Sequence, residues 1–484
     1  MADLSKPTVP ASSPTNLSEA FDQVKAAGLQ DLNVAVDAAA TIGSTSTAKS
    51  VATSENVTGS STSLSEVLYN SAVQASASGT NVAAVKADAG LSGIATTTAA
   101  SSASTSNGTA SAFAAMAEAA GIQDLDRLTV GGELTGLGKS LNTMSATADN
   151  VAGASSAASE LSGSIEGFEG AQMGISSNAS LQGLAQFSNT ATAFTSTGAA
   201  DAEAFAQQLQ GADLTGLKVG GEANVVGQAT LSNLSTAEAV TGASEAESKM
   251  GTGAQGLVAS GATFDLDGAG AGTVNSAAGL DISSDAGLTG LASITNNATA
   301  KTSAGSVDAD AIGTSIQGAN LNTVQIGGVG TIGGQATYSA KATAENVNGG
   351  YSDALADLDN ASGLVAGAKL NIASDATIQG LTSISNDAMA TGTAASSAGS
   401  TAIAEANVLK GADLFSDTDI GGIGSITGQV NFGSKATGEN VTGNSLASAS
   451  LGEQTAAGTF TADSGLAQGL VTGNAASGLS LIHI

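Results

Sequence analysis

Closely spaced acidic residues are the side chains in this sequence whose type and spacing could do chemistry. The segment Asp265-Leu266-Asp267-Gly268-Ala269-Gly270 offers carboxylates and a glycine-containing loop, which suit the flexible oxygen coordination of Ca²⁺. Other close pairs are Asp308/Asp310, Asp357/Asp359 and Asp417/Asp419. The EF-hand loop with its distal Glu is absent, as is the glycine–aspartate nonapeptide repeat. Asp265 and Asp267 are therefore candidate ligands of a structural Ca²⁺, and solvated turn acids are the favoured alternative.

Nucleophilic and metal-assisted catalysis lack most of the residues they need. The chain has no cysteine and one histidine, His483, so a Ser-His-Asp or Cys-His arrangement and a zinc or iron site are excluded if that terminal residue is set aside. Glycine-rich phosphate-binding patterns carry no weight among 64 glycines. No pair of carboxylates is singled out for glycoside hydrolysis. We therefore predict that the protein is not an enzyme and, beyond the Ca²⁺ candidate, has no cofactor.

The C-terminal hexapeptide has its own interpretation. Residues 479–484, Leu-Ser-Leu-Ile-His-Ile, are identical to the translation of a transposase adapter used in DNA sequencing libraries. We interpret them as that translation, which removes His483 from the natural protein and leaves the last repeat truncated. An ordinary apolar tail is the alternative.

A long internal repeat must position any functional group. An Ala-Thr-x-acid-Asn-Val-x-Gly element recurs about every hundred residues, which indicates an array whose units pack mainly on their neighbours. Its valines are Val57, Val151, Val240, Val347 and Val441, at offsets of 94, 89, 107 and 94. We divide the chain into a flexible Pro/Ser/Thr tail (1–17), an N-terminal helix (18–27), repeats 28–120, 121–210, 211–317 and 318–410, a truncated repeat 411–478, and the hexapeptide 479–484.

Short helices are predicted to punctuate the repeats. Residues 18–27, 111–120 and 201–210 each precede a glycine that suits a left-handed helix cap, and Phe21 and Val24 would share the apolar face of the first. The corresponding glycines are Gly28, Gly121, Gly211, Gly318 and Gly411. An acidic or amide residue then precedes a leucine, which predicts a helix-to-strand turn. These residues are Asp31, Asp124, Asp213, Asn320 and Asp413.

Alternation with a period of two follows the turn and predicts strands. From Ile326 to Ala342 the even positions are small or apolar and most odd positions are polar, and a second alternating stretch runs from Leu280 to Ala300. Each unit is therefore interpreted as two half-units, about ten in all. Because the alternation is longer than the usual strand of about 3–10 residues, we expect breaks at Gly-Gly pairs and at Asn, with several short strands per half-unit.

Two recurrent polar residue types have two interpretations each. Asn189, Asn296 and Asn386 could form an amide ladder along the stack or occupy left-handed turns. Threonine-rich stretches such as 96–98 and 190–192 could form a flat ice-binding surface or an ordinary solvated sheet face, and the second is favoured because threonine has a high strand propensity.

Composition limits the classes of partner. With 42 acids against 13 bases the net charge is −29, which disfavours nucleic acid and anionic lipid, and no apolar run is long enough to insert into a membrane. Apolar residues make up 42% but aromatics only 3%, so the core must be thin. All three prolines lie within the first 14 residues, which leaves later hydrogen-bond ladders uninterrupted.

These observations predict a mainly β, elongated tandem-repeat fold, either β-solenoid-like or made of stacked small sheets, with short helices in each repeat. The composition is similar to that of bacterial repeat adhesins and phage fibres as a class. We expect a non-enzymatic structural or adhesive protein, outside the cell or on its surface, without an N-terminal signal peptide. A virion fibre, an intracellular self-assembling scaffold and a solenoid carbohydrate-active enzyme are the alternatives. Expected interactions are self-association through strand edges and contacts with surface glycans or other cell-surface partners.

Overall fold

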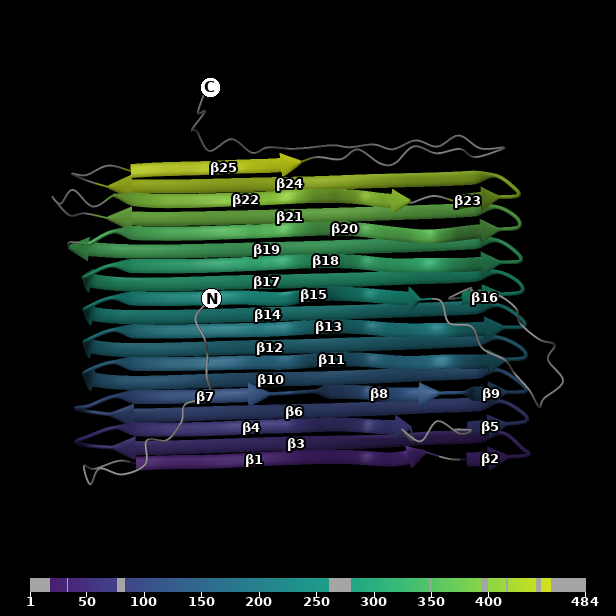
Figure 1. Ribbon diagram of the computed structural model, residues 1–484, viewed down its shortest axis with the longest axis horizontal. Helices are drawn as coiled ribbons and strands as arrows, with labels where there is room; N and C mark the ends of the chain where they lie inside the picture. Colours follow the sequence, from purple (N-terminus) through teal and green to yellow (C-terminus); the bar gives the residue numbers. More distant parts are fainter. Residues whose placement is uncertain are drawn as a thin grey trace.

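The protein folds into two stacked parallel β-sheets. A computed structural model describes residues 18–32, 34–75, 83–260, 280–348, 350–392, 399–414, 417–440 and 445–453. Strand pairing is parallel in both sheets, and the chain passes alternately from one sheet to the other, so that the strands lie one above another from β1 to β25 (Figure 1). A sheet A segment and the sheet B strand that follows it form one coil. The mainly β, solenoid-like prediction is confirmed, whereas the alternative of stacked small sheets is not.

Sheet A has sixteen strands, some of them short segments that share a level. They are β1 (Ser18–Leu32), β2 (Val34–Val36), β4 (Ser61–Ala75), β5 (Ala83–Val85), β7 (Ala110–Met116), β8 (Ala119–Asp126), β9 (Leu128–Val130), β11 (Ser155–Ile175), β13 (Ala200–Val219), β15 (Ser244–Ser260), β16 (Leu280–Ile282), β18 (Val307–Ile326), β20 (Ser352–Ile372), β22 (Ser400–Leu414), β23 (Asp417–Ile420) and β25 (Ser445–Glu453).

Sheet B has nine strands, one for each coil. They are β3 (Ala40–Asn56), β6 (Ala89–Thr105), β10 (Leu134–Ala152), β12 (Ala179–Thr197), β14 (Ala223–Thr241), β17 (Ala286–Ala304), β19 (Gly330–Asn348), β21 (Ala376–Gly392) and β24 (Gly424–Asn440). At about 4.8 Å per coil and about 3.3 Å per residue, the described body is wider along its strands than it is tall along its stacking axis.

The predicted helices are wrong in the part of the chain that the structure describes. Residues 18–27 lie in β1, 111–120 lie in β7 and β8 and the turn between them, and 201–210 lie in β13. In β13, Asp201 and Glu203 face solvent while Ala202 and Ala204 are buried. This is a period of two, and it outweighs the helical spacing because each alanine packs in the shared interior. Gly318 and Gly411 likewise lie inside β18 and β22.

Long strands replace the expected short ones throughout sheet B and in part of sheet A, whereas β7, β8 and β9 divide one level of sheet A as we expected. β12 has 19 residues and β20 has 21. Backbone groups of these inner strands form hydrogen bonds to the coil above and to the coil below. A strand that is paired along both sides can be longer than a strand of an ordinary small sheet. Gly-Gly pairs do end strands at the corners that precede β10, β14, β19 and β24, whereas Gly333-Gly334 lies within β19. Asn189, Asn296 and Asn386 do not break strands, because they are buried inside β12, β17 and β21, whereas Asn56 and Asn440 are the last residues of β3 and β24.

These buried asparagines support the amide-ladder interpretation in part. Asn189, Asn233 and Asn296 are register neighbours, and Asn233 Nδ2 donates to Asn296 Oδ1 over 3.2 Å. Asn296 Nδ2 also donates to the Ile312 carbonyl at 2.7 Å, which ties sheet B to sheet A. None of these asparagines has a positive φ, so they do not form left-handed turns.

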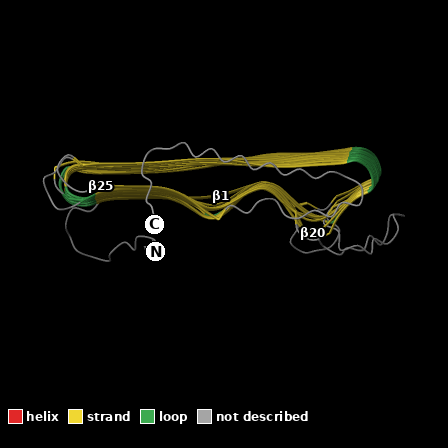
Figure 2. Cartoon of the chain, turned by 90° about the horizontal axis from the view of Figure 1, so that it is seen from above, coloured by secondary structure: helices red, strands yellow, loops and turns green. Residues whose placement is uncertain are grey.

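Facing glycines bring the two sheets together along one line. Sheet A undulates while sheet B stays straight (Figure 2). A Cβ on Gly211 of sheet A would lie 2.1 Å from the Gln228 nitrogen, and a Cβ on Gly183 of sheet B would lie 2.0 Å from the Gly211 oxygen. Only glycine permits such backbone contact. This line, the glycine waist, is formed by Gly121, Gly167, Gly211, Gly256, Gly318, Gly363 and Gly411 in sheet A and by Gly138, Gly183, Gly227, Gly290, Gly334 and Gly380 in sheet B. The glycines predicted as helix caps therefore make the closest contacts between the sheets.

The waist separates two hydrophobic cores. The first, here the alanine core, contains mainly alanines such as Ala202 and Ala298, with columns of larger side chains that include Phe187 and Tyr338 in sheet B and Leu209 in sheet A. The second, here the leucine core, is filled by Leu, Ile and Val, among them Leu217, Leu288 and Ile372. In both cores the residues predicted on the apolar face of 326–342 and 280–300 are buried, so that alternation is confirmed.

A carboxylate or amide clamp explains why the repeat spans two coils. Asp88 Oδ1 accepts a hydrogen bond from the Glu133 N–H of the next coil over 2.9 Å, and a Cβ on Gly132 would lie 2.1 Å from that oxygen. The same clamp joins Asn178 to Gly221, Asp285 to Gly328, and Asp375 to Gly422. One corner therefore carries the Asx residue and the next must carry glycine. Because the corner type repeats only at every second coil, the sequence repeats with a period near a hundred residues.

The opposite corner alternates as well. Asn150 Nδ2 and Asn346 Nδ2 donate to glycine carbonyls, Gly108 and Gly305, and Thr195 and Thr302 do the same with their hydroxyls in the coils between. The glycines of this corner have positive φ values, 118° at Gly153 for example. The valines that mark the repeat follow this position and are exposed, as at Val57 (74%) and Val151 (55%), so they mark a corner and not the core.

Candidate functional site

The predicted acidic residues fall into two groups. Asp265 and Asp267 lie outside the described residues. Asp308 and Asp310 lie on the outer face of β18, over the alanine core, and Asp357 lies on the outer face of β20. Within the described ranges, no group of three or more His, Cys, Asp or Glu side chains could hold a metal ion.

Stacked acids line the outer face of sheet A. Asp201, Glu245, Asp308 and Asp353 are register neighbours on four successive strands, and Glu203, Glu247 and Asp310 form a second row beside them. Lys249 forms an ion pair with Glu247. Partial burial, followed by the nearby acids, raises the pKa of Asp201 to about 6 and the pKa of both Glu203 and Asp310 to about 7. We call these two rows the acidic ladders, and in them Glu203 and Asp310 are partly protonated near neutral pH.

A line of polar side chains, here named the polar trough, follows the outer side of the glycine waist, where the backbone of sheet A bends toward sheet B (Figure 2). Gln210, Gln255 and Gln317 occupy one wall in successive coils, and their amides bond in series over 3.1 and 2.7 Å. Three residues further along each strand, the other wall carries Asp213, Val258 and Asn320 in register. Asn320 Nδ2 donates across the trough to Gln317 Oε1 over 3.0 Å. The trough is thus a line of hydrogen-bonding groups parallel to the stacking axis.

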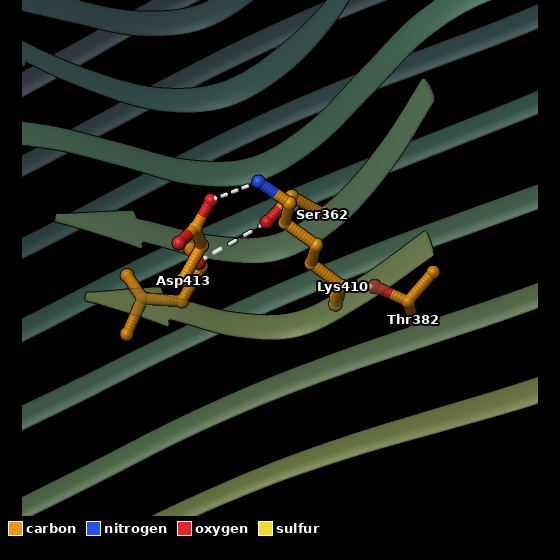
Figure 3. Close-up of polar contacts among 5 residues, drawn as sticks. Ser362, Thr382, Lys410 and Asp413 are labelled. Atoms are coloured by element: carbon orange, nitrogen blue, oxygen red, sulfur yellow. Dashed lines mark hydrogen bonds and ion pairs between the residues drawn. The ribbon is translucent and has the colours of Figure 1, made fainter. Parts of the chain in front are cut away.

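Near β20 and β22 the trough widens into a hollow of about 210 Å³. Lys410 Nζ and Asp413 Oδ2 form an ion pair over 2.5 Å on one side of it, and Ser362 lies beside them on the neighbouring strand (Figure 3). Thr382 reaches across from sheet B, where its Oγ1 donates to the Lys410 carbonyl over 2.6 Å. Gln317, Asn360 and Val365 also line the hollow. The hollow can accept a small polar group, but its ion pair already satisfies the charges.

Three carboxyls occupy the trough in β11 and β13. Burial and the neighbouring Glu166 raise the pKa of Glu169 to about 8, and burial with Glu169 nearby raises the pKa of Asp213 to about 6. Burial also raises the pKa of Glu166, whose Oε1 accepts a hydrogen bond from Ser164 Oγ at 2.9 Å. These groups can store protons. No histidine occurs among the described residues, so these carboxyls take part in no Ser-His or Cys-His arrangement there.

A second hollow of about 310 Å³ lies where the clamp corners meet sheet B. Its acids include Glu133, Glu222 and Asp285. Asp285 Oδ1 accepts the Val329 N–H and Glu133 Oε1 accepts from Asn178 Nδ2, so two of these carboxylates serve the contact between coils.

The sequence contained a signal for the trough that we interpreted differently. Gln317 and Asn320 are three residues apart, as are Gln210 and Asp213 and the pair Lys410 and Asp413. We assigned Asp213, Asn320 and Asp413 to a helix-to-strand turn, but in the structure they lie within strands and the following leucines enter the leucine core. Only the bend at the waist brings positions i and i+3 to opposite walls.

No family model, curated protein or solved structure matches the chain. In the described residues, no helix is long and apolar enough to cross a membrane.

Proposed function

We propose that this chain is a rigid, non-enzymatic structural and adhesive element, displayed outside a bacterial cell. One observation carries the proposal: in sheet B every pairing from β3 to β24 keeps its register from end to end, as in the unbroken pairing of β14 with β17. A continuous ladder of this kind resists bending and local opening, because each inner strand can leave only by breaking bonds to two neighbours. Further coils of the same kind would elongate the body by about 4.8 Å each.

The surface chemistry supports display in a saline medium. Two acids on each of β13, β15 and β18 lie on the outer face of sheet A, and the net charge of −29 opposes nonspecific aggregation. The absence of cysteine means that oxidation cannot crosslink the chain. A virion fibre would need the same rigidity and is the second proposal for the location, and an intracellular scaffold is the third.

Self-association through strand edges belongs to the same proposal. Among the described strands, β1 and β3 each pair with one neighbour. An edge of this length presents a row of backbone donors and acceptors that a second copy can pair with.

Labelling of intact cells tests the display role. Antibodies raised against the full chain should stain unpermeabilised cells of the encoding organism, and a cytosolic enzyme stained in parallel controls for leakage. Staining that requires lysis would overturn display in favour of an intracellular scaffold, and staining of purified phage particles would assign the chain to a virion. Release of reducing sugars from glycans by the pure chain would overturn the non-enzymatic assignment.

A further inference from the structure

The outer face of sheet B carries a regular lattice of hydroxyl groups. It covers the outward positions of 96–102, 141–147, 186–192, 230–236 and 293–299 on five neighbouring strands, β6, β10, β12, β14 and β17. Fifteen of these twenty outward residues are Thr or Ser. We call this surface the hydroxyl patch. Its residues are partly or fully exposed, Thr143 and Ser188 among them, so the lattice faces solvent.

Register makes the lattice regular in two directions. Thr147, Thr192, Thr236 and Thr299 follow one another at the same level of successive strands. Neighbouring strands are about 4.8 Å apart and outward residues along one strand about 6.6 Å apart, so the hydroxyls repeat with two fixed short periods.

Flatness extends the lattice over the whole patch. Adjacent strands of ordinary sheets rotate by about 20–25°, and flat sheets occur where stacking holds them. Here sheet B stays straight along its strands in Figure 2, and its strands remain parallel from β3 to β24 in Figure 1. The glycine waist and the buried side chains hold this sheet from beneath, which fixes the lattice before any ligand arrives.

Charge distinguishes the patch from the rest of the molecule. None of its twenty outward positions carries Asp, Glu, Lys or Arg, although the chain has 42 acids and a net charge of −29. Sheet A carries the acidic ladders on its opposite outer face. A neutral surface of hydroxyls and threonine methyls does not impose on water the strong orientation that a charge imposes.

We infer that the hydroxyl patch binds the surface of ice, with its hydroxyls bonding to a lattice of ordered water at matching intervals. The inference rests on the proposed role as a rigid body, because a mobile face has no lattice. Crystalline polysaccharide is the other flat solid with repeated hydroxyls. It is disfavoured because the patch contains no aromatic residue on which a sugar ring could stack. Binding strength comes from many weak contacts made at once, so the patch should be sensitive to a single bulky or charged residue at its centre.

Ice affinity of the full chain tests the inference. The chain should concentrate in slowly grown ice and inhibit recrystallisation of polycrystalline ice. Thr192→Lys places a charge on β12, the middle strand of the patch, and should raise the concentration required by about tenfold or more. The matched control is Ser156→Lys on the outer side of β11 in sheet A, which should behave as the parent chain.

Four outcomes would overturn the inference. The first is a folded parent chain that has no effect on ice, and the second is an equal loss of ice activity in Thr192→Lys and Ser156→Lys. The third is binding to cellulose or chitin that Thr192→Lys abolishes while activity on ice is unaffected. The fourth is a parent chain that is not folded. Circular dichroism and hydrogen exchange of the parent separate the last from the others. Only an unfolded parent would also overturn the rigid-body proposal.

Discussion

The two cores on either side of the glycine waist fill the space between the sheets with different side chains. In the leucine core, side chains such as Leu288 and Ile372 fill the space where sheet A moves away from sheet B. In the alanine core, alanines of both sheets, such as Ala298 in sheet B and Ala202 in sheet A, fill a narrower gap. Burial of a leucine contributes about 1.5–3 kcal/mol and one methylene about 0.8 kcal/mol. The leucine core therefore supplies more hydrophobic stabilisation per residue, and the alanine half depends more on its hydrogen-bond ladders.

The difference also affects the outer faces. The acidic ladders lie over the alanine core, at Asp201, Glu203 and Asp310. Stacked like charges oppose folding of the strands that carry them. The half with the weaker core thus also carries the less favourable electrostatics, which predicts that the alanine half opens first.

Removing a large side chain from the leucine core should have the largest effect on this comparison. Leu288→Ala should lower the free energy of unfolding by about 2–5 kcal/mol, because a fully buried leucine leaves a cavity in a closed interior. Ala298→Gly in the same strand, β17, should cost only about 0.5–1 kcal/mol. Urea denaturation of the full chain, followed by circular dichroism, measures both. Equal losses of unfolding free energy in the two variants would contradict the larger hydrophobic stabilisation that we assign to the leucine core.

Filling the waist should have an intermediate effect. A Cβ on Gly334 would lie 2.0 Å from the Gly363 oxygen, whereas a Cβ on the adjacent Gly333 would meet nothing within 4 Å. Gly334→Ala should therefore destabilise by about 1–3 kcal/mol through forced separation of the sheets. Gly333→Ala is the matched control and should be neutral or slightly stabilising. Thermal denaturation compares the two, and a similar loss in both would show that the waist is not a close contact.

A change of pH should have a smaller effect on stability than the two core and waist substitutions, and it should act on the alanine half. Burial and neighbouring acids raise the pKa of Asp310 to about 7 and that of Glu203 likewise, above the unfolded values near 4. The folded chain then binds more protons than the unfolded chain between about pH 4 and pH 7, so stability falls as the pH rises through this range.

Asp310→Asn measures this contribution. Near pH 8 it should stabilise the chain by about 1 kcal/mol, after allowance for solvent screening, and near pH 4 it should change little. Asp149→Asn, an exposed acid on sheet B, is the control. Melting temperatures of the three proteins at both pH values decide the matter, and a stabilisation by Asp310→Asn at pH 4 equal to that at pH 8 would be inconsistent with a raised pKa.

Sequence predicted the faces of the strands better than their ends or their neighbours. Alternation placed Ile332 and Tyr338 inside and Thr331 and Thr337 outside, because a period of two is a local property. The helix over 201–210 was wrong because alanine and glutamate have a high helix propensity although their alternation fits a strand. The choice depends on contact with strands about 45 residues away in sequence.

Contacts between coils also could not be predicted from the sequence. The glycine at Gly211 is explained by Gln228 and Gly256, and Gly132 by Asp88 in the preceding coil. Neither relation has a local signature. The trough depends on the same bend, so Gln210 and Asp213 could be recognised as residues but not as facing walls.

The alternation of Asx and glycine corners has a consequence for how a gene of this kind can change in length. Duplication or loss of one coil would place two Asx corners such as that of Asp88 in neighbouring coils, or would leave a Gly-Gly corner without the Asx oxygen that accepts its hydrogen bond. A change of two coils keeps every clamp. Length variants of this gene should therefore differ by coil doublets, so the inherited unit is the doublet although the folding unit is the single coil.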